Sequence, residues 1–425
     1  MKLLIEILPQ YINLLSLIFP WLWLWRALKS IFFWIHLWQL KEYHLGRFAC
    51  HFQTHKGKSI FKRPLLWLKI SALILAFYFS HFSFFIFLTL FFLYLVEGFV
   101  FFARILQRKL ILPHLTFKAI FLILVNIIFF SFIAWYFAFD FKILVLWDIG
   151  DFSAISTLIL IFQPISFFFR KRKINLAIQK RKLFKNLLAI GITGSFGKTS
   201  TKEFLSTILE TKYGKDRVLK TPEHQNSEIA ISNLLINELN LTHLFLVCEM
   251  GAYNKGGISL LAKMVKPKIG IVCGVNEQHL SLFGSLSNLL SAEGGKELLE
   301  SLPEDGILIY NGEDQVLCKI YDNLPKERKR IVGIEKKEFD LSAFNIKIEK
   351  TKLSFFALSR SDGEVAKFEV NLIGAQNIIN LLLAACCAKE LGIDLAESAV
   401  AFHNLKPQQG GIVFSKTPRL FNVLD

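Results

Sequence analysis

The residues with the clearest chemical potential lie between positions 193 and 200 of the 425-residue chain. They combine two glycines with a lysine and several hydroxyls, in the order Thr193, Gly194, Ser195, Phe196, Gly197, Lys198, Thr199 and Ser200. Glycines let a backbone approach phosphate oxygens closely, a lysine amine offsets their charge, and a neighbouring hydroxyl can ligate Mg²⁺. This spacing predicts a loop that binds ATP together with Mg²⁺.

The flanking segments are the elements that such a loop requires. The apolar run 187–193 is typical of a buried strand, and residues 200–211 carry an apolar face at helical spacing. A helix that starts directly after a glycine turn points its unpaired N–H groups and its positive dipole end at bound phosphate. The order of strand, loop and helix therefore supports nucleotide binding.

A carboxylate that suits the same chemistry is Glu249. It ends the apolar run 245–249, as expected for a strand that delivers a metal ligand to the phosphate loop. A solvated strand end would give the same pattern.

Further segments follow the loop in a fixed order. They are Lys220-Thr221-Pro222 before Asn226, Glu249-Met250-Gly251-Ala252, His279 to Gly284, Asn311 to Asp314, and Gly374 to Asn380. Together with the loop, this order resembles the Mur ligase family over about residues 187–425. Within that family, Glu249-Met250-Gly251-Ala252 with the later Gly256-Gly257-Ile258 is most similar to the member that adds D-Ala-D-Ala to a UDP-MurNAc-tripeptide.

The resemblance implies an ATP-dependent amide ligase, which converts a substrate carboxylate into an acyl phosphate that an amine then attacks. Lys198 would offset charge on the transferred phosphoryl group. Thr199 and Glu249 would hold one Mg²⁺. His279 would hold a second Mg²⁺ near the substrate carboxylate, although a lone histidine is often structural.

The same resemblance assigns three asparagines. Asn377 and Asn380 would lie near the nucleotide, and Asn226 would lie on the substrate side. The first two could instead cap or bridge a helix.

The chain departs from the family pattern at the second metal site. The family usually has a lysine two residues before a glutamate, and this lysine is carbamylated to hold the metal. Here Gly295 occupies that place before Glu297, and Lys296 is adjacent. Either Lys296 substitutes for that lysine, or the second metal site differs. Many members also have an asparagine where this chain has Gly274.

Length is a second departure. The family has a C-terminal domain that receives the amine, whereas this sequence stops at Asp425, and apolar segments replace the usual N-terminal UDP-sugar domain. We therefore expect a fragment or a chain that relies on another chain, which binds Mg-ATP but ligates poorly alone. Its substrate would be a UDP-MurNAc-peptide or a lipid-linked precursor.

The first 170 residues have the composition of a membrane region. Hydrophobic residues make up 53% of the chain, with 43 Phe, and the excess lies before about residue 170. We expect about five spanning helices. They cover residues 3–25, two spans within 65–102, 119–139 and 152–169. Five tryptophans are expected as anchors at the membrane interface: Trp21, Trp23, Trp25, Trp34 and Trp38.

Loop charges predict the orientation of these helices. The loops 39–64 and 103–118 and the segment 170–186 are basic, whereas the connection 140–151 carries Asp140, Asp148 and Asp151. The positive-inside rule then puts the ATP-binding domain in the cytoplasm. It also explains the net charge of +16 through contact with membrane lipid, so no nucleic acid is expected as a partner.

The expected organisation is a membrane α-helical region at 1–169, a basic juxtamembrane linker at 170–186, and a central α/β domain at 187–425 with a mostly parallel sheet. The C-terminal ligase domain is expected to be missing. The leading function is peptidoglycan precursor ligation at the cell membrane. The alternatives are a related ligase of another polymer, of the poly-γ-glutamate type, and a non-catalytic membrane scaffold with a vestigial nucleotide site.

Overall fold

The computed structural model describes residues 2–41, 43–223, 225–252, 254–276, 279–336, 338–349, 352–372, 374–403, 405, 413–417 and 420–424. Side chains are described within 14–405, apart from those at 47, 61, 80, 281 and 282. The chain divides into two compact units, a helical unit at Met1–Phe168 and an α/β unit at Phe169–Asp425.

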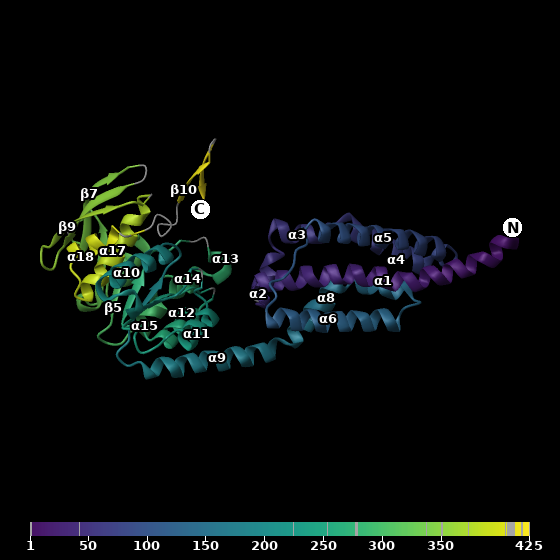
Figure 1. Ribbon diagram of the computed structural model, residues 1–425, viewed down its shortest axis with the longest axis horizontal. Helices are drawn as coiled ribbons and strands as arrows, with labels where there is room; N and C mark the ends of the chain where they lie inside the picture. Colours follow the sequence, from purple (N-terminus) through teal and green to yellow (C-terminus); the bar gives the residue numbers. More distant parts are fainter. Residues whose placement is uncertain are drawn as a thin grey trace. The chain divides into compact units, whose positions relative to one another are not determined.

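The helical unit consists of long apolar helices and short connecting ones (Figure 1). Its elements are α1 (Lys2–Leu40), α2 (Leu45–His51), α3 (His55–Phe61), α4 (Pro64–Tyr78), the 3₁₀ turn η1 (Ser80–Phe82), α5 (Ser83–Leu106), α6 (Phe117–Tyr136), α7 (Phe141–Ile149) and α8 (Asp151–Ile161). The expected tight hairpin within 65–102 is present, since η1 joins α4 to α5. Pro64 starts α4, a position at which its missing N–H costs no helical hydrogen bond.

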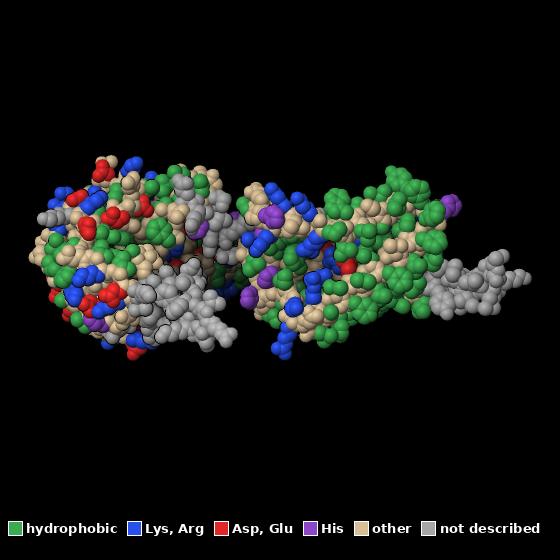
Figure 2. Space-filling model, turned by 90° about the horizontal axis from the view of Figure 1, so that it is seen from above, with side chains coloured by type: hydrophobic (Ala, Val, Ile, Leu, Met, Phe, Trp, Pro, Cys, Tyr) green, Lys and Arg blue, Asp and Glu red, His purple; other side chains and the backbone are tan. Residues whose placement is uncertain are grey.

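Four stretches of the described chain are long and apolar enough to cross a membrane, judged by length and composition. They are Leu14–Leu40, Ser83–Leu106, Phe117–Tyr136 and Asp151–Leu183, and α4 is a shorter apolar helix. Large side chains such as Phe85, Phe99 and Ile128 point outward with more than 60% of their surface exposed, as lipid-facing residues would. Figure 2 shows Lys and Arg gathered over one end of this unit's visible face and hydrophobic side chains over the other.

Three details of the sequence prediction for this unit are wrong. Arg26 and Lys29 do not end the first helix, because α1 continues through them for 39 residues. The connection 140–151 is not an exposed acidic loop: most of it is α7, and Asp148 and Asp151 are buried.

The third correction concerns tryptophans expected as interfacial anchors. Trp23, Trp34 and Trp38 are buried inside the helical unit, whereas Trp21 and Trp25 are exposed. The buried indoles donate hydrogen bonds, as Trp23 does to the carbonyl oxygen of Leu144. Buried tryptophans need such partners because an unpaired N–H in an apolar interior is costly.

The α/β unit is built on a nine-stranded sheet in the order β2-β3-β1-β4-β5-β6-β7-β8-β9. Its strands are β1 (Leu188–Thr193), β2 (Val218–Lys220), β3 (Phe245–Glu249), β4 (Ile269–Val272), β5 (Ile307–Asn311), β6 (Lys329–Ile334), β7 (Leu341–Ile348), β8 (Leu353–Ser359) and β9 (Val365–Val370). Pairing is parallel from β2 through β7, and β7–β8 and β8–β9 are antiparallel. This confirms the expected mostly parallel sheet. A separate hairpin joins β10 (Val413–Thr417) to β11 (Leu420–Leu424).

Helices cover both faces of this sheet (Figure 1). They are α10 (Lys198–Tyr213), α11 (Glu228–Asn237), α12 (Gly257–Val265), α13 (Leu280–Phe283), α14 (Leu286–Ala292), α15 (Lys296–Ser301), α16 (Gln315–Tyr321), α17 (Gln376–Glu390) and α18 (Leu395–Phe402), with 3₁₀ turns η2 (Lys215–Arg217) and η4 (Lys326–Arg328).

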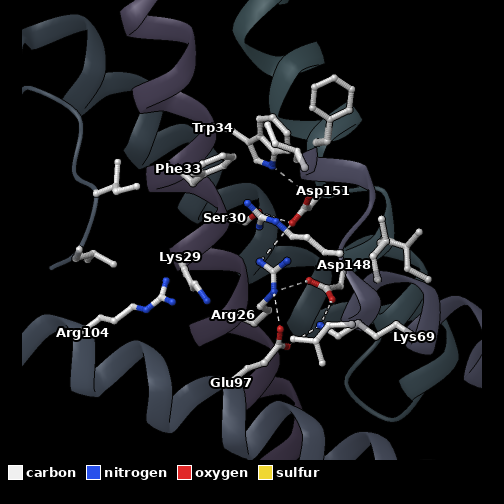
Figure 3. A pocket seen from close by; sticks show the side chains of 18 of the residues that line it. Arg26, Lys29, Ser30, Phe33, Trp34, Lys69, Glu97, Arg104, Asp148 and Asp151 are labelled. Atoms are coloured by element: carbon white, nitrogen blue, oxygen red, sulfur yellow. Dashed lines mark hydrogen bonds and ion pairs between the residues drawn. The ribbon is translucent and has the colours of Figure 1, made fainter. Parts of the chain in front are cut away.

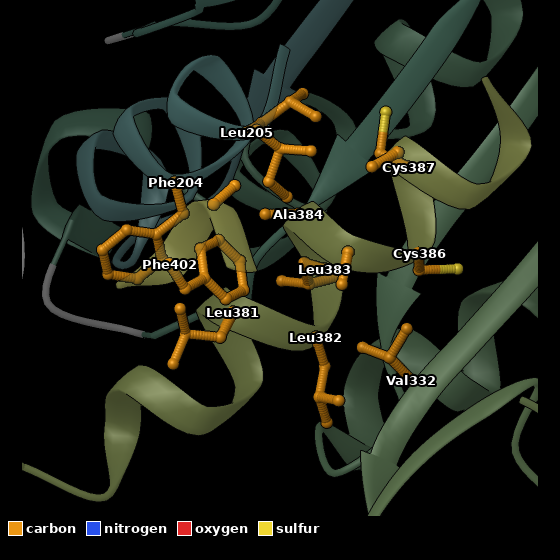
Figure 4. Packing of buried hydrophobic residues seen from close by; sticks show 14 of the residues in the cluster. Phe204, Leu205, Val332, Leu381, Leu382, Leu383, Ala384, Cys386, Cys387 and Phe402 are labelled. Carbon is orange, nitrogen blue, oxygen red and sulfur yellow. The ribbon is translucent and has the colours of Figure 1, made fainter. Parts of the chain in front are cut away.

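Alternate residues of the central strands enter two separate cores. Ile190 and Ile192 of β1 pack with α10, α17 and α18, and Ala189 packs with α11, α12 and α15 on the other face. Figure 4 shows the first core, where Phe204 of α10 meets Phe402 of α18. Burial on both faces explains why these strands read as continuous apolar runs.

The basic segment 170–186 is mostly helical, because α9 (Gln163–Leu183) runs through it. Its last turns pack on the α/β unit through Ile174 and Ala177. Arg181 is buried there and donates hydrogen bonds to the carbonyl oxygens of Val265 and Leu187 at 2.7 and 3.0 Å. Part of the charge in this segment therefore holds the helix to the domain.

Candidate functional site

The phosphate-loop residues lie between β1 and α10, as the sequence predicted. Gly194 and Gly197 have φ angles of +139° and +79°, a region that favours glycine. A Cβ on Gly197 would lie 2.5 Å from the side-chain oxygen of Asn380, and one on Gly194 would lie 3.0 Å from the carbonyl oxygen of Gly274. Both positions therefore require glycine for conformation and for space.

The loop is held in place by Ser195. Its N–H donates to the carbonyl oxygen of Gly274 at 2.8 Å, and its hydroxyl donates to Glu293 at 2.6 Å. The same hydroxyl accepts from the Asn276 N–H at 2.9 Å. These bonds give the Ser195 hydroxyl, predicted as a nucleotide contact, two partners within the protein.

The rest of the loop surrounds the start of α10. Thr193 is buried at the end of β1, Ser200 lies half-buried in the first helical turn, and Phe196 is 49% exposed. The Lys198 ammonium donates to the carbonyl oxygens of Gly194 and Ser195. A bound phosphate would offer this ammonium oxygens of higher charge than these carbonyls.

The strand order brings Glu249 to the loop. Because β1 and β3 are parallel neighbours, Ile192 stands opposite Glu249, and the two strands end side by side. The Thr199 hydroxyl donates to Glu249 Oε2 at 3.0 Å, and the Asn226 amide donates to Glu249 Oε1 at 2.9 Å. Glu249 is only 3% exposed, so it is not a solvated strand end.

A buried lysine that the sequence analysis missed lies behind this carboxylate. Lys202 is completely buried, with its Nζ 3.7 Å from Glu249 Oε2 and 3.1 Å from Glu203 Oε1. Its position three residues after Thr199 puts it on the same helical face, which is the signal that could have identified it. Lys202 compensates part of the negative charge that Glu249 brings into a buried site.

Thr199 and Glu249 fit a magnesium ion. Hydroxyl and carboxylate oxygens are the donors that Mg²⁺ prefers, and Mg²⁺ usually completes its shell with substrate phosphate and water. Within the described part of the chain, no group of three or more His, Cys, Asp or Glu could hold a metal. These side chains therefore suit a metal that arrives with a nucleotide.

His279 lies against a second acid that the sequence analysis did not single out. Its Nδ1 is 2.8 Å from Glu293 Oε1, and Glu293 is 4% exposed. Since Glu293 also accepts from the Ser195 hydroxyl, it joins the histidine to the phosphate loop. A carboxylate on one ring nitrogen fixes the orientation of the imidazole, which favours a ligand or positioning role for the other nitrogen. No spacing pattern in the sequence marks Glu293.

The segment around Lys296 has a different arrangement. Lys296 is exposed at the start of α15, and no described hydrogen bond or ion pair joins it to Glu249 or His279. Gly295 has a φ of +82°, and a Cβ there would lie 2.4 Å from the Val272 side chain. A lysine at position 295 would therefore be strained in this backbone.

Two further positions concern the loop surroundings. A Cβ on Gly274 would lie 2.4 Å from Cζ of Phe196, so the larger residue common at this position would displace the ring. Asn377 is 1% exposed in α17, and Asn380 lies against Gly197 at 6% exposure. Asn380 therefore supports the loop backbone.

A thiol beside the loop brings no charge to it. The Cβ of Cys273 would be 3.3 Å from a Cβ on Gly194, and burial raises the pKa of the Cys273 thiol to about 12. The thiol is thus neutral at physiological pH, which leaves the loop free of a competing anion.

Residues 192–388 match the family described as Mur ligase middle domain. The UDP-N-acetylmuramoyl-tripeptide--D-alanyl-D-alanine ligase of Bacillus subtilis is 28% identical over 217 residues, which are 51% of this chain and 44% of that protein. The ligase of the same name from Buchnera aphidicola is 32% identical over 210 residues, 49% of this chain and 44% of that protein. The chain thus spans less than half the length of these relatives.

Among solved structures, a crystal structure of MurF from Acinetobacter baumannii is similar with a TM-score of 0.54. The match covers 60% of this chain and 54% of that chain at 23% identity. It confirms the fold that the ordered sequence segments predicted for the α/β unit.

Proposed function

Because residues 192–388 match the Mur ligase middle domain family, we propose that this chain binds Mg-ATP for ligation of a peptidoglycan precursor. The observation that carries the proposal is the contact of the Thr199 hydroxyl with Glu249, 3.0 Å apart at the mouth of a glycine loop. Together with the Lys198 ammonium at the start of α10, this contact offers oxygen donors for a metal and a cation for phosphate.

Each residue has a distinct task in this proposal. The α10 N-terminus and Lys198 bind and orient the nucleotide phosphates, since both present positive charge to them. A magnesium ion held by Thr199 and Glu249 would offset charge on the phosphate oxygens. Asn226 and Lys202 hold the Glu249 carboxylate in place through contacts at 2.9 and 3.7 Å.

His279 and Glu293 form the second part of the proposed site. Their contact at 2.8 Å holds the imidazole in one orientation. In this proposal the imidazole would hold the second Mg²⁺ to which the sequence analysis assigned His279. Lys296 is the weaker candidate for that site because its side chain is exposed and no described bond joins it to His279 or Glu249.

The proposed substrates follow the printed names of the relatives. We propose a UDP-MurNAc-tripeptide as the carboxylate substrate and D-Ala-D-Ala as the amine. The four apolar stretches support attachment to a membrane, and the basic segment 170–186 supports a cytoplasmic face for the α/β unit. The five-helix topology and the orientation of these helices remain predictions.

Nucleotide binding by the whole chain in detergent tests the proposal directly. We expect Lys198→Ala to weaken Mg-ATP binding roughly a hundredfold, because it removes a charge-assisted contact to phosphate. Isothermal titration calorimetry measures the affinity. The control is Lys212→Ala, which removes a lysine from the far end of α10 that pairs with Glu397 at the surface.

Equal affinities of wild type and Lys198→Ala would refute the proposed nucleotide site. Substrate choice is measured separately, as ADP release stimulated by UDP-MurNAc-tripeptide with D-Ala-D-Ala or by glutamate. Stimulation by glutamate alone would favour the poly-γ-glutamate type of ligase.

A further inference from the structure

A cavity of about 490 Å³ lies within the helical unit and is lined by residues of α1, α3, α4, α5, α7, α8 and the loop after α5 (Figure 3). Its volume is in the range of small-ligand sites. Six basic side chains line it: Arg26, Lys29, Arg63, Lys69, Arg104 and Lys109. Three acidic ones line it as well: Glu97, Asp148 and Asp151. The formal charge of the lining is therefore +3.

The inner wall of the cavity is an ion-pair network. Lys69, only 2% exposed, lies 2.6 Å from Glu97 and 2.7 Å from Asp148. Arg26 reaches all three carboxylates at 3.5 to 3.6 Å. Tyr94 also donates to Asp148, at 2.7 Å.

Asp151 has its own neutral donors in this wall. Ser30 donates to one of its oxygens, and Trp34 donates to the other at 3.3 Å. Each of the three carboxylates that line the cavity is thus paired with Arg26, Lys69 or a neutral donor of the inner wall.

The outer wall holds basic side chains without acidic partners. Among the described residues, no salt bridge is formed by Lys29, Arg63, Arg104 or Lys109, and the Arg63 guanidinium lies over the Phe33 ring at 5.4 Å. Figure 3 shows Lys29 and Arg104 extending toward one another beside the Arg26 network. Two cations that converge in a partly enclosed space repel each other unless an anion lies between them.

The remaining wall is apolar. Leu65, Leu66, Leu110 and Ile111 line the cavity, and Ile111 and the following Leu112 are also half exposed on the outside. An anion that carried an apolar chain would match both walls, because its charge would meet Lys29 and Arg104 and its chain would meet the leucines.

We infer that this cavity binds the phosphate headgroup of an anionic lipid, as a site separate from the ATP loop. The inner network shapes the site, and Lys29, Arg104 and Lys109 contact the phosphate oxygens. Basic pockets between membrane helices are a known means of recognising such headgroups. A purely structural role is sufficient for Arg26 and Lys69, because they pair with carboxylates from other helices. It does not explain why the outer wall of the cavity carries further basic side chains.

Lipid retention by the purified whole chain tests the inference. Native mass spectrometry compares phosphatidic acid with phosphatidylserine and phosphatidylcholine. We expect phosphatidic acid to bind most tightly. We expect the double variant Lys29→Gln/Arg104→Gln to lower its affinity roughly tenfold or more, because two charge-assisted contacts are lost. Lys62→Gln is the matched control, because Lys62 is an exposed basic residue beside Arg63 that does not line the cavity.

Two additional measurements distinguish a loss of binding from a loss of folding, and a lipid ligand from a soluble phosphate. Arg104→Lys keeps the charge and should keep the affinity, and unchanged thermal unfolding of the double variant shows that it is folded. Competition by inorganic pyrophosphate tests a soluble phosphate source. Pyrophosphate binding without phosphatidic acid binding, equal affinity for phosphatidylcholine, or equal losses in the double variant and in Lys62→Gln would each overturn the inference.

Discussion

The two units of this chain bury charged groups in different ways. In the α/β unit, Thr199, Lys202 and Glu249 come from one helix start and the end of a neighbouring strand. In the helical unit, Ser30 and Asp151 are 121 positions apart, and Lys69 meets Asp148 from 79 positions away. The first arrangement follows from a local motif and a strand order, whereas the second exists only when several helices pack together.

The largest expected effect breaks the network of the helical unit. Lys69→Gln should destabilise that unit by about 3–5 kcal/mol, because it leaves Glu97 and Asp148 buried with less compensating charge. Thermal unfolding in detergent measures the loss. ATP binding by the folded α/β unit should stay unchanged.

Lys62→Gln serves as the control here as well, since it changes an exposed lysine close by in sequence. Equal destabilisation by both substitutions would show that the network contributes no more than a surface charge.

A smaller effect is expected in the α/β unit. Glu249→Gln should weaken Mg-ATP binding roughly tenfold to a hundredfold, because it removes the anionic metal ligand beside Thr199. Binding of ATP without Mg²⁺ should not weaken. Calorimetric titrations with Mg²⁺ and with a chelator provide the comparison.

Glu203→Gln is the matched control, since the Glu203 side chain also contacts Lys202, whereas the Thr199 hydroxyl donates to Glu249. If both variants lost the same Mg-dependent affinity, the loss would come from the charge around Lys202 and not from a metal ligand.

The smallest effect is a pH dependence within the same unit. Burial raises the pKa of Glu203, but the hydrogen bond from Lys220 and the charge of Lys202 outweigh it, so the pKa is lower than usual. Burial lowers the pKa of Lys220, but Glu203 and Glu210 outweigh it, so that pKa is higher than usual.

The sign of this dependence follows from the two shifts. The Glu203 contribution is present above the unfolded pKa of about 4.3 and is lost as pH falls through the lower folded pKa. The Lys220 contribution is present below the unfolded pKa of about 10.4 and is lost as pH rises through the higher folded pKa. Glu203→Gln should cost about 1 kcal/mol or less between these limits, measured by hydrogen exchange of α10 amides, and should remove the acid-side loss. An unchanged acid-side loss in this variant would contradict the assignment to Glu203.

The sequence by itself determined the phosphate loop, the mostly parallel sheet and the membrane-like composition. The loop residues lie within eight positions of the sequence, so their spacing directly fixes how close they are in space. They include Gly194, Gly197, Lys198 and Thr199. The apolar run that ends at Glu249 likewise indicated a strand end. Local spacing was sufficient because a loop between a strand and a helix positions these groups with little help from the rest of the chain.

Only the tertiary structure decided which groups Glu293 and Lys202 contact. It also decided that Asp148 and Asp151 are buried. Glu293 reaches Ser195 and His279 because α14 ends beside the loop after β4. The sequence placed the two aspartates in an acidic connection between two spans, and the structure buries them beside Arg26. A charge in a sequence does not reveal its solvent exposure, because exposure depends on which distant helices pack over it.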